Sequence, residues 1–212
     1  MYLMLLGAPG VGKGTQAKVL EEKFNMTQVS TGDILRAEIA KGTELGKLAK
    51  SFIEAGNLVP DNIMIGIIGK ELDDRDLIFD GFPRTLAQAE AFEMMLEKLN
   101  KKLDFVINIS LDDKIIVGRL SGRMICRNCG QSFHLQFAKP KVDGFCDLCN
   151  GELYQRPDDR PESITERLNN YHSKTKPLIN FYEKKKILVS IDGDKDSSEV
   201  FKEIVKVMKG KE

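Results

Sequence analysis

A glycine-rich loop near the start of the chain has the residues needed to bind phosphate. It reads Gly7-Ala8-Pro9-Gly10-Val11-Gly12-Lys13-Gly14-Thr15 and joins an apolar run, residues 2–6, to a segment with helical periodicity, residues 13–24. Glycines let backbone N–H groups converge on anionic oxygens without Cβ clashes, and the start of the helix adds a partial positive charge. Lys13 adds a full positive charge, so the pattern predicts a P-loop that holds nucleotide phosphates. The alternative, a tight turn beside a surface lysine, does not account for this spacing of glycines.

The loop departs from the general P-loop pattern at one position. Gly14 stands where that pattern has Ser or Thr, and Thr15 comes next. The usual assignment of that hydroxyl to magnesium is therefore in doubt.

The four cysteines of the chain have the spacing of a metal site. Cys126, Cys129, Cys146 and Cys149 form two C-x2-C pairs separated by sixteen residues. Two such turns can direct four thiolates at one point, which is the tetrahedral arrangement that zinc prefers. A four-thiolate site leaves no position for water, so we expect the zinc to be structural. Disulfides or a redox pair are the alternative.

Arginines and aspartates at other predicted strand ends indicate a second phosphate site. Arg84, in Asp80-Gly81-Phe82-Pro83-Arg84, can clamp an anion with two parallel hydrogen bonds. Asp80 can hold magnesium or its bound waters. Ser30-Thr31-Gly32-Asp33 with Arg36 forms a similar turn. Further arginines flank the cysteine-rich segment, which predicts an element that closes over phosphates: Arg119, Arg123, Arg156 and Arg167.

The composition restricts the class of protein. The 212 residues carry 32 basic and 32 acidic side chains, and this formal net charge of zero weakens the case for a general nucleic-acid binder. No apolar run is long enough to span a membrane, and the first six residues lack the basic start of a signal peptide. We expect a cytoplasmic protein without membrane or nucleic-acid partners.

Alternating strand and helix patterns predict an α/β fold. Apolar runs at 2–6, 28–30, 77–79, 105–109 and 187–191 are candidate strands, and helical patterns separate them. This order predicts a parallel sheet with helices on both faces and with ligands beyond the carboxyl ends of the strands. Expected helices cover 13–24, 33–41, 44–55, 61–72, 85–99, 112–120, 161–174, 177–185 and 197–208. Residues 121–159 break this rhythm and indicate a small insertion.

These motifs, taken in order, resemble the adenylate kinases, a family of nucleoside monophosphate kinases, in the bacterial form with a long zinc-containing lid. The resemblance covers the whole chain and includes the Gly14-Thr15 ending of the loop. The motifs that carry it are Gly7–Thr15, Ser30–Asp33 with Arg36, Asp80–Arg84 with Gln88, Gly122-Arg123, and Asp158-Asp159 before Arg167.

The resemblance implies a three-layer P-loop fold with a five-stranded parallel sheet. The core would comprise residues 1–29, 60–121 and 160–212. A small helical AMP-binding segment would span 30–59, and a zinc-stapled lid would span 122–159.

The resemblance also implies reversible phosphoryl transfer from MgATP to AMP, giving two ADP, in a monomer with structural Zn²⁺. The catalytic residues would be Lys13, Arg84, Arg123, Arg156 and Arg167. The ATP-binding residues would be Gly10, Val11, Gly12, Lys13, Gly14, Thr15, Arg119, Arg123, Ser132, Phe133 and Lys195. The AMP-binding residues would be Thr31, Arg36, Asn57, Leu58, Val59, Gly81, Phe82, Pro83, Arg84, Gln88, Arg156 and Arg167.

Two alternatives stay open at this point. The acceptor could be UMP, CMP or GMP, although Thr31 and Gln88 favour adenine by resemblance. The chain could also be a zinc-ribbon binding module fused to a nucleotide switch, which the zero net charge disfavours.

Overall fold

The computed structural model describes residues 1–210 and contains a five-stranded parallel sheet. The spatial order of the strands is β2-β3-β1-β4-β8, with every neighbouring pair parallel. Their bounds are β1 (Tyr2–Leu6), β2 (Thr27–Ser30), β3 (Leu77–Asp80), β4 (Phe105–Ser110) and β8 (Leu188–Asp192). The predicted sheet is thus confirmed, with strand ends within one residue of the expected ones. The carboxyl ends of β1, β2 and β3 lie at one edge, which brings together the loops that follow them.

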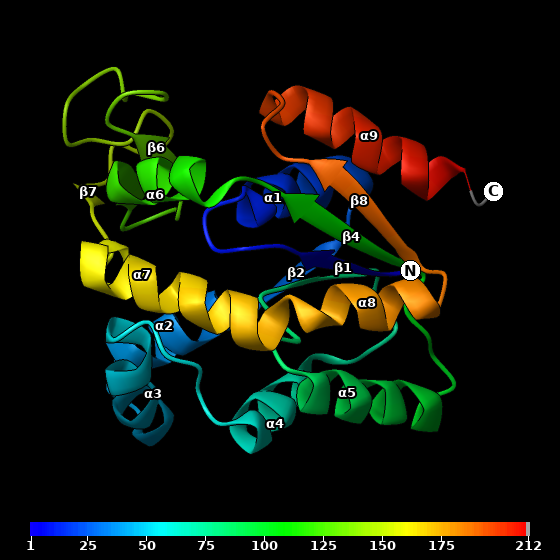
Figure 1. The fold of residues 1–212 in the computed structure, drawn as a ribbon. Helices are drawn as coiled ribbons and strands as arrows, with labels where there is room; N and C mark the ends of the chain where they lie inside the picture. Colours follow the sequence, from blue (N-terminus) through cyan, green and yellow to red (C-terminus); the bar gives the residue numbers. More distant parts are fainter. Residues whose placement is uncertain (211–212) are drawn as a thin grey trace.

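Helices cover both faces of the sheet (Figure 1). In that view α1 and α9 lie above the sheet, α4 and α5 lie below it, and α7 and α8 cross in front. The bounds are α1 (Lys13–Phe24), α2 (Thr31–Lys41), α3 (Glu44–Glu54), α4 (Asp61–Glu71), α5 (Leu86–Lys98), α6 (Asp113–Ser121), α7 (Pro161–Asn170), α8 (Pro177–Lys184) and α9 (Ser197–Lys209).

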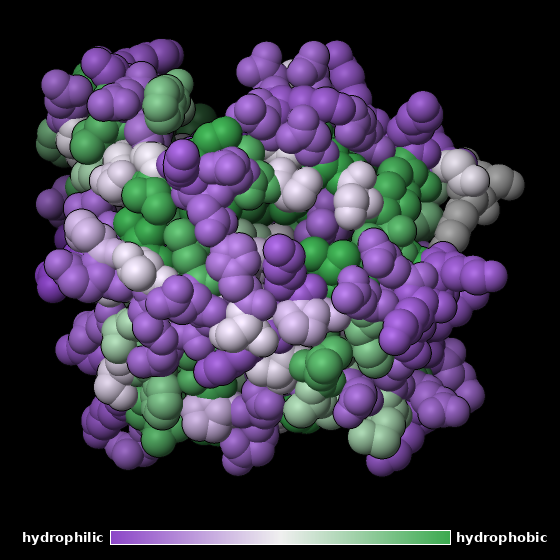
Figure 2. All heavy atoms as spheres, viewed as in Figure 1, coloured by the Kyte–Doolittle hydropathy of each residue, from purple (hydrophilic) through white to green (hydrophobic). Residues whose placement is uncertain are grey.

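The alternating side chains of the strands divide the core in two. In β1, Tyr2, Met4 and Leu6 pack toward α4, α5 and α8, whereas Leu3 and Leu5 pack toward α1, α6 and α9. All five are buried, as expected for a central parallel strand. The molecular surface differs from this core, because hydrophilic side chains cover most of the face seen in Figure 1, including much of α9 (Figure 2).

Side-chain caps fix where several helices begin. Ser30 Oγ accepts from the N–H of Asp33 at 3.3 Å, and Thr85 Oγ1 accepts from the N–H of Gln88 at 3.1 Å. Each cap satisfies an N–H group that the first helical turn leaves without a partner. The caps place α2 and α5 immediately after β2 and the loop that follows β3, so both helices start at the ligand-binding edge of the sheet.

The cysteine-rich insertion, residues 122–159, forms a small sheet of its own. Strands β5 (Arg123–Cys126), β6 (Ser132–His134) and β7 (Leu153–Tyr154) are antiparallel in the order β6-β5-β7. The sequence predicts a small insertion with a metal site there, but it does not predict these strands. The three strands are two to four residues long, which is too short for an alternating pattern to be evident.

Two further features concern the helices. The helix expected over 161–174 ends earlier, at Asn170, and a five-residue π turn, Tyr171–Thr175, joins α7 to α8 where a break was expected only after residue 174. Within residues 1–210, no helix combines the length and apolar composition that a membrane crossing requires.

Candidate active site

The glycine-rich loop follows β1 and wraps over the start of α1, as predicted. Gly7, Gly10 and Gly12 have φ values of 138°, 82° and 105°, which side chains other than glycine rarely adopt. A Cβ atom on Gly7 would lie 2.4 Å from the backbone oxygen of Ile109. The loop can therefore take this shape only with glycine at position 7.

Lys13 turns back onto the loop. Its Nζ donates to the backbone oxygens of Gly7 and Ala8, both at 2.8 Å. Burial, together with Arg84, Arg167 and Arg123, lowers the pKa of Lys13 to about 8, although Asp80 acts in the opposite direction. The ammonium group is thus held beside the loop, among other cations, where a phosphate would stabilise it.

A cluster of arginines faces this loop. Burial and the nearby Arg167 lower the pKa of Arg84 to about 10, and burial with Arg36 and Arg123 lowers the pKa of Arg156 to about 10. These groups come from the loop after β3, from α2, from both ends of the insertion and from α7. The structure therefore brings together the predicted catalytic set, Lys13, Arg84, Arg123, Arg156 and Arg167, whose mutual repulsion an anion would relieve.

Two buried aspartates hold part of this cluster, and the predicted site set did not include them. Asp159 accepts from Arg123 Nε at 2.8 Å and Nη2 at 2.6 Å, and from Arg167 Nη1 at 2.9 Å. Asp158 forms an ion pair with Arg167 at 3.1 Å. Burial alone would raise the pKa of Asp158, but Arg167, Arg36, Arg123 and Arg156 outweigh it and keep that pKa below its usual value. An acidic pair between Pro157 and Pro161 among arginines was the available signal.

Asp33 connects the insertion to α2. Its Oδ1 pairs with Arg36 Nη2 at 2.7 Å and with Arg156 Nη2 at 3.3 Å. The Asp33 carboxylate therefore lies between two arginines, Arg36 of α2 and Arg156 at the end of the insertion. A second contact lies near the cysteines, where Lys18 Nζ of α1 donates to the backbone oxygen of Gly130 at 2.7 Å. The insertion thus lies against both helices.

The loop after β3 is held by its neighbours. Thr31 Oγ1 donates to the Gly81 oxygen at 3.0 Å, and Arg84 Nε donates to the same oxygen at 2.8 Å. The N–H of Arg84 donates to Gln88 Oε1 at 2.7 Å, and Gln88 Nε2 donates to Asp61 at 2.7 Å. Both ends of the Gln88 amide, which sequence analysis assigned to a base, therefore have protein partners in this structure. Asp61 is a residue that sequence reasoning missed.

The remaining predicted residues lie around this centre. Asp80 Oδ2 accepts from Gln28 at 3.1 Å and lies 3.4 Å from the position of a Cβ on Gly14. Arg119 Nη2 donates to the Gly193 oxygen at 3.1 Å, and Asn57 Oδ1 accepts from Asn170 at 3.3 Å.

For four predicted residues the structure shows other surroundings. The side chain of Phe133 is buried among Cys126, Cys146 and Leu153 in the core of the insertion. Ser132 is exposed, and Lys195 pairs with Glu203 on the surface. Val59 is buried in the core beneath α4.

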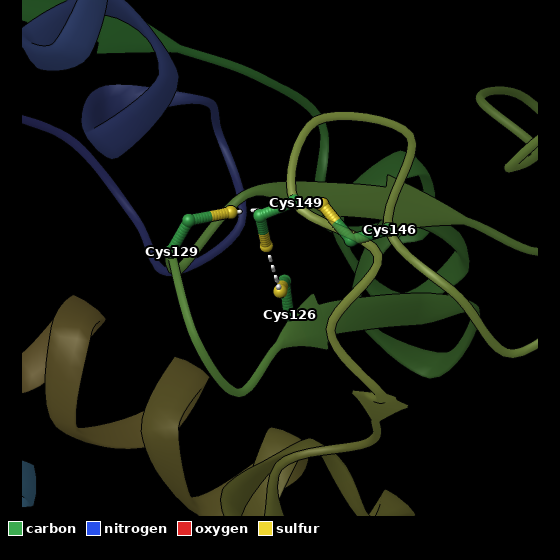
Figure 3. Close-up of side chains that lie close together, drawn as sticks. All are labelled: Cys126, Cys129, Cys146 and Cys149. Carbon is green, nitrogen blue, oxygen red and sulfur yellow. Dashed lines mark hydrogen bonds between the residues drawn. The ribbon is translucent and has the colours of Figure 1, made fainter.

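The four cysteines form a separate centre (Figure 3). Their sulfur atoms all lie within 4.8 Å of one another, with Cys126 and Cys149 at 3.4 Å and Cys129 and Cys146 at 3.6 Å. All four are free thiols, so the disulfide alternative is not what the structure shows. Four ligands at about 2.3 Å from a tetrahedral metal are about 3.8 Å apart. The cluster therefore fits a four-thiolate metal site.

The two C-x2-C turns have the same backbone geometry. The N–H of Gly130 donates to the Cys126 oxygen at 3.0 Å, and the N–H of Asn150 donates to the Cys146 oxygen at 2.9 Å. Gly130 and Asn150 both have left-handed φ values, 66° and 55°. Burial opposes ionisation of Cys126, but N–H groups of Cys129 and Asn128 lower the pKa of its thiol to about 6. At Cys149 the N–H of Gly151 also favours the thiolate, but hydrogen bonds with the other three sulfur atoms outweigh it and raise the pKa. The cluster thus favours one thiolate, and a bound cation would be needed to ionise all four ligands.

Comparisons with known proteins show the family of the chain. Residues 5–187 match the family model described as adenylate kinase. Among curated relatives, an adenylate kinase of Archaeoglobus fulgidus is 52% identical over 212 residues, covering 98% of each chain. Adenylate kinases of Methanosarcina mazei and Caldicellulosiruptor bescii are each 49% identical and cover 98% of this chain and 98% and 99% of their own. The chain belongs to the adenylate kinase family and is an ATP:AMP phosphotransferase.

Proposed function

We propose that the cationic cluster is the site of phosphoryl transfer between ATP and AMP. The supporting observation is the convergence of Lys13, Arg84, Arg123, Arg156 and Arg167 on one space between the P-loop, the loop after β3 and the insertion. Each of these groups comes from a different part of the sequence. Their shared charge is what two nucleotides with facing phosphates would neutralise.

On the ATP side, the loop Gly10–Thr15 would hold the phosphates through its N–H groups. Lys13 would exchange its two loop carbonyls for phosphate oxygens. Arg119, which lies against the Gly193 carbonyl, and Lys195 would border the adenine, and Arg123 with Ser132 and Phe133 would contact ATP from the insertion. The role of Phe133 would be through its backbone, because its side chain is buried in the insertion.

On the AMP side, Arg36 and Arg84 would hold the phosphate. Thr31 and Gln88 would border the base, with Asn57, Leu58, Val59 and the loop Gly81–Arg84 completing the site. Because both ends of the Gln88 amide are engaged, adenine would bind through the second lone pair of Gln88 Oε1 or by displacing Asp61.

The reaction needs no protein nucleophile, because an oxygen of the AMP phosphate attacks the terminal phosphorus of ATP directly. Catalysis then consists of alignment and charge neutralisation. Arg123, Arg156 and Arg167 would surround the transferred group. Residues 122–159 would act as a lid that excludes water, residues 30–59 as the AMP-binding segment, and the rest of the chain as the core.

Two metals belong to this proposal. Zinc at Cys126, Cys129, Cys146 and Cys149 would fix the shape of the lid, since four thiolates leave no open coordination position. Magnesium accompanies ATP, and its hard-cation chemistry fits the Asp80 carboxylate at the end of β3, which would contact it through water. We also propose a monomer, because one chain supplies every part of the site, in the cytoplasm, a reducing compartment that suits free thiols.

The test measures ADP formation from MgATP with AMP, UMP, CMP and GMP offered separately. We expect a strong preference for AMP and conversion of ADP back to ATP and AMP. Lys13→Ala should abolish most turnover while circular dichroism stays unchanged. Arg123→Ala should lower the rate on the order of 10²–10³-fold, as loss of a transition-state donor does. Arg160→Ala is the matched control, because Arg160 is a neighbouring exposed arginine. Equal effects of Arg123→Ala and Arg160→Ala would refute the proposed site.

A further inference from the structure

A π turn separates two helices that would otherwise be one. The N–H of Lys176 donates to the oxygen of Tyr171 at 2.8 Å, five residues earlier. Pro177 explains the interruption, because it has no N–H to donate to Ser173 and its ring collides with a helical carbonyl. One additional residue in the turn rotates the following helix by about 100°, and such turns often occur at functional sites.

The last residue of this turn reaches the loop after β3. Thr175 Oγ1 donates to the backbone oxygen of Arg84 at 2.9 Å, across 91 positions in the sequence. The other aliphatic hydroxyl of the turn behaves differently, since Ser173 Oγ donates locally to the Asn169 oxygen at 2.6 Å. A local bond of that kind is the usual choice for a helical hydroxyl. Thr175 instead forms a tertiary contact.

This contact completes the immobilisation of Arg84. The N–H of Arg84 donates to Gln88 Oε1 at 2.7 Å, and the carbonyl oxygen of Arg84 accepts from Thr175 Oγ1 at 2.9 Å. Both polar groups of the Arg84 main chain are therefore held. The side chain is fixed at Nε by the Gly81 oxygen at 2.8 Å. Within residues 1–210, neither Nη of Arg84 has a hydrogen-bond partner, which leaves this end of the guanidinium available to an anion.

We propose that Thr175 is a positioning residue for AMP: through the Arg84 carbonyl, its hydroxyl sets the direction in which Arg84 presents its guanidinium to the AMP phosphate. This inference rests on the proposed assignment of Arg84 to the AMP site. It predicts a selective effect, because the side-chain hydrogen bond that Thr175 makes within residues 1–210 goes to the loop after β3 and not to the P-loop or the insertion. Loss of the hydroxyl should weaken binding of AMP and leave binding of ATP unchanged.

The main variant is Thr175→Val, which keeps the β-branched shape and removes the hydroxyl. We expect KM for AMP to rise about fivefold, the ratio that corresponds to one ordinary hydrogen bond, with KM for ATP within twofold of wild type. Thr175→Ser should restore KM for AMP. Ser173→Ala is the matched control, since it removes the neighbouring hydroxyl and should change neither constant. AMP binding in calorimetry, without ATP, should show the same fivefold loss.

A double-mutant cycle separates this inference from the assignment on which it rests. If Thr175 acts through Arg84, adding Thr175→Val to Arg84→Gln should cause no further rise in KM for AMP. No effect of Arg84→Gln alone would overturn the AMP-site assignment. A large effect of Arg84→Gln with none of Thr175→Val would overturn only the role of Thr175. Equal rises in both KM values, or failure of Thr175→Ser to restore, would show a merely structural threonine and also refute the inference.

Discussion

Asp159 is the residue whose replacement tests the charge arrangement of the site most directly. Its side chain is fully buried and accepts three hydrogen bonds, two from Arg123 and one from Arg167. Asp159→Asn keeps the shape and removes the charge. The new NH₂ group faces a guanidinium N–H, so at least one hydrogen bond becomes a donor–donor contact.

The structure sets the expected magnitude. Removing one partner of a buried ion pair costs about 3–5 kcal/mol. Here the lower end applies, because Arg123 and Arg167 keep 18% and 16% of their side-chain exposure and Asp158 still pairs with Arg167. About 3 kcal/mol corresponds to a fall in Tm of roughly 6–12 °C for a chain of this size. If the insertion opens to water, the buried charges become solvated and the fall in Tm becomes smaller, so 12 °C is the upper bound of the expected fall.

The assay is thermal unfolding with and without nucleotides, beside turnover. ATP and AMP together should shrink the difference in Tm between wild type and Asp159→Asn, because their phosphates give the two arginines new acceptors. Glu152→Gln is the control: it alters an exposed ion pair of the same insertion, Arg127–Glu152 at 3.0 Å, and should shift Tm by less than about 2 °C. A Tm change for Asp159→Asn no larger than that of the control, with turnover within twofold of wild type, would refute the buried cluster.

Four more predictions concern the P-loop and the cysteine centre. Because burial lowers the pKa of Lys13 to about 8, the affinity for ATP should fall as the pH rises above 8, by up to about tenfold per pH unit. Calorimetric titrations over a pH series measure this fall, and Lys13→Arg should remove it. The free energy of unfolding should instead rise with pH between about 8 and 10.5, because in that range the unfolded chain still holds the proton of Lys13, whose ordinary pKa is 10.5, and the folded chain has lost it. Urea midpoints measured across this pH range test the rise, and midpoints without it would contradict a lowered pKa of Lys13. Gly7→Ala places a Cβ 2.4 Å from the Ile109 oxygen and should lower both Tm and ATP binding, whereas Gly118→Ala, where a Cβ meets no atom within 4 Å, should lower neither. Chelation of the proposed zinc should increase amide exchange in residues 123–154 before it does so in the parallel sheet, and uniform exchange would exclude a structural role specific to the insertion.

The sequence allowed the main sheet and its phosphate loop to be predicted because their signals are local. The run Tyr2–Leu6 is apolar throughout, and the glycines of the following loop define where α1 begins. Strands of this kind are buried on both faces whatever surrounds them. The cysteine centre was predictable for the same reason, since its ligand spacing lies within two short turns.

The features that sequence analysis missed depend on contacts between distant residues. Acidic side chains are rarely buried, so the motif Asp158-Asp159 did not by itself indicate that Asp159 would lie buried between two arginines. Gln88 was assigned to a base, yet its partner Asp61 comes from another helix. The π turn also escaped prediction, because Pro177 signals a break in helical hydrogen bonding but not whether the chain remains helical through it.

The buried aspartates explain how a chain of zero net charge can hold a strongly cationic site. Without nucleotide, Asp158 and Asp159 partly neutralise Arg123 and Arg167, which limits the cost of collecting like charges. Burial is the largest cause of the lowered pKa values of Lys13, Arg84 and Arg156, and neighbouring cations lower them further. Asp158 offsets part of this effect at Arg84 and Arg156. Phosphates of bound nucleotides would add to that compensation. If every cation had a carboxylate partner, nucleotides would bind weakly; if none had, the product ADP would leave slowly. We therefore expect the two carboxylates to affect both the binding of nucleotides and the release of ADP, on which turnover in both directions depends.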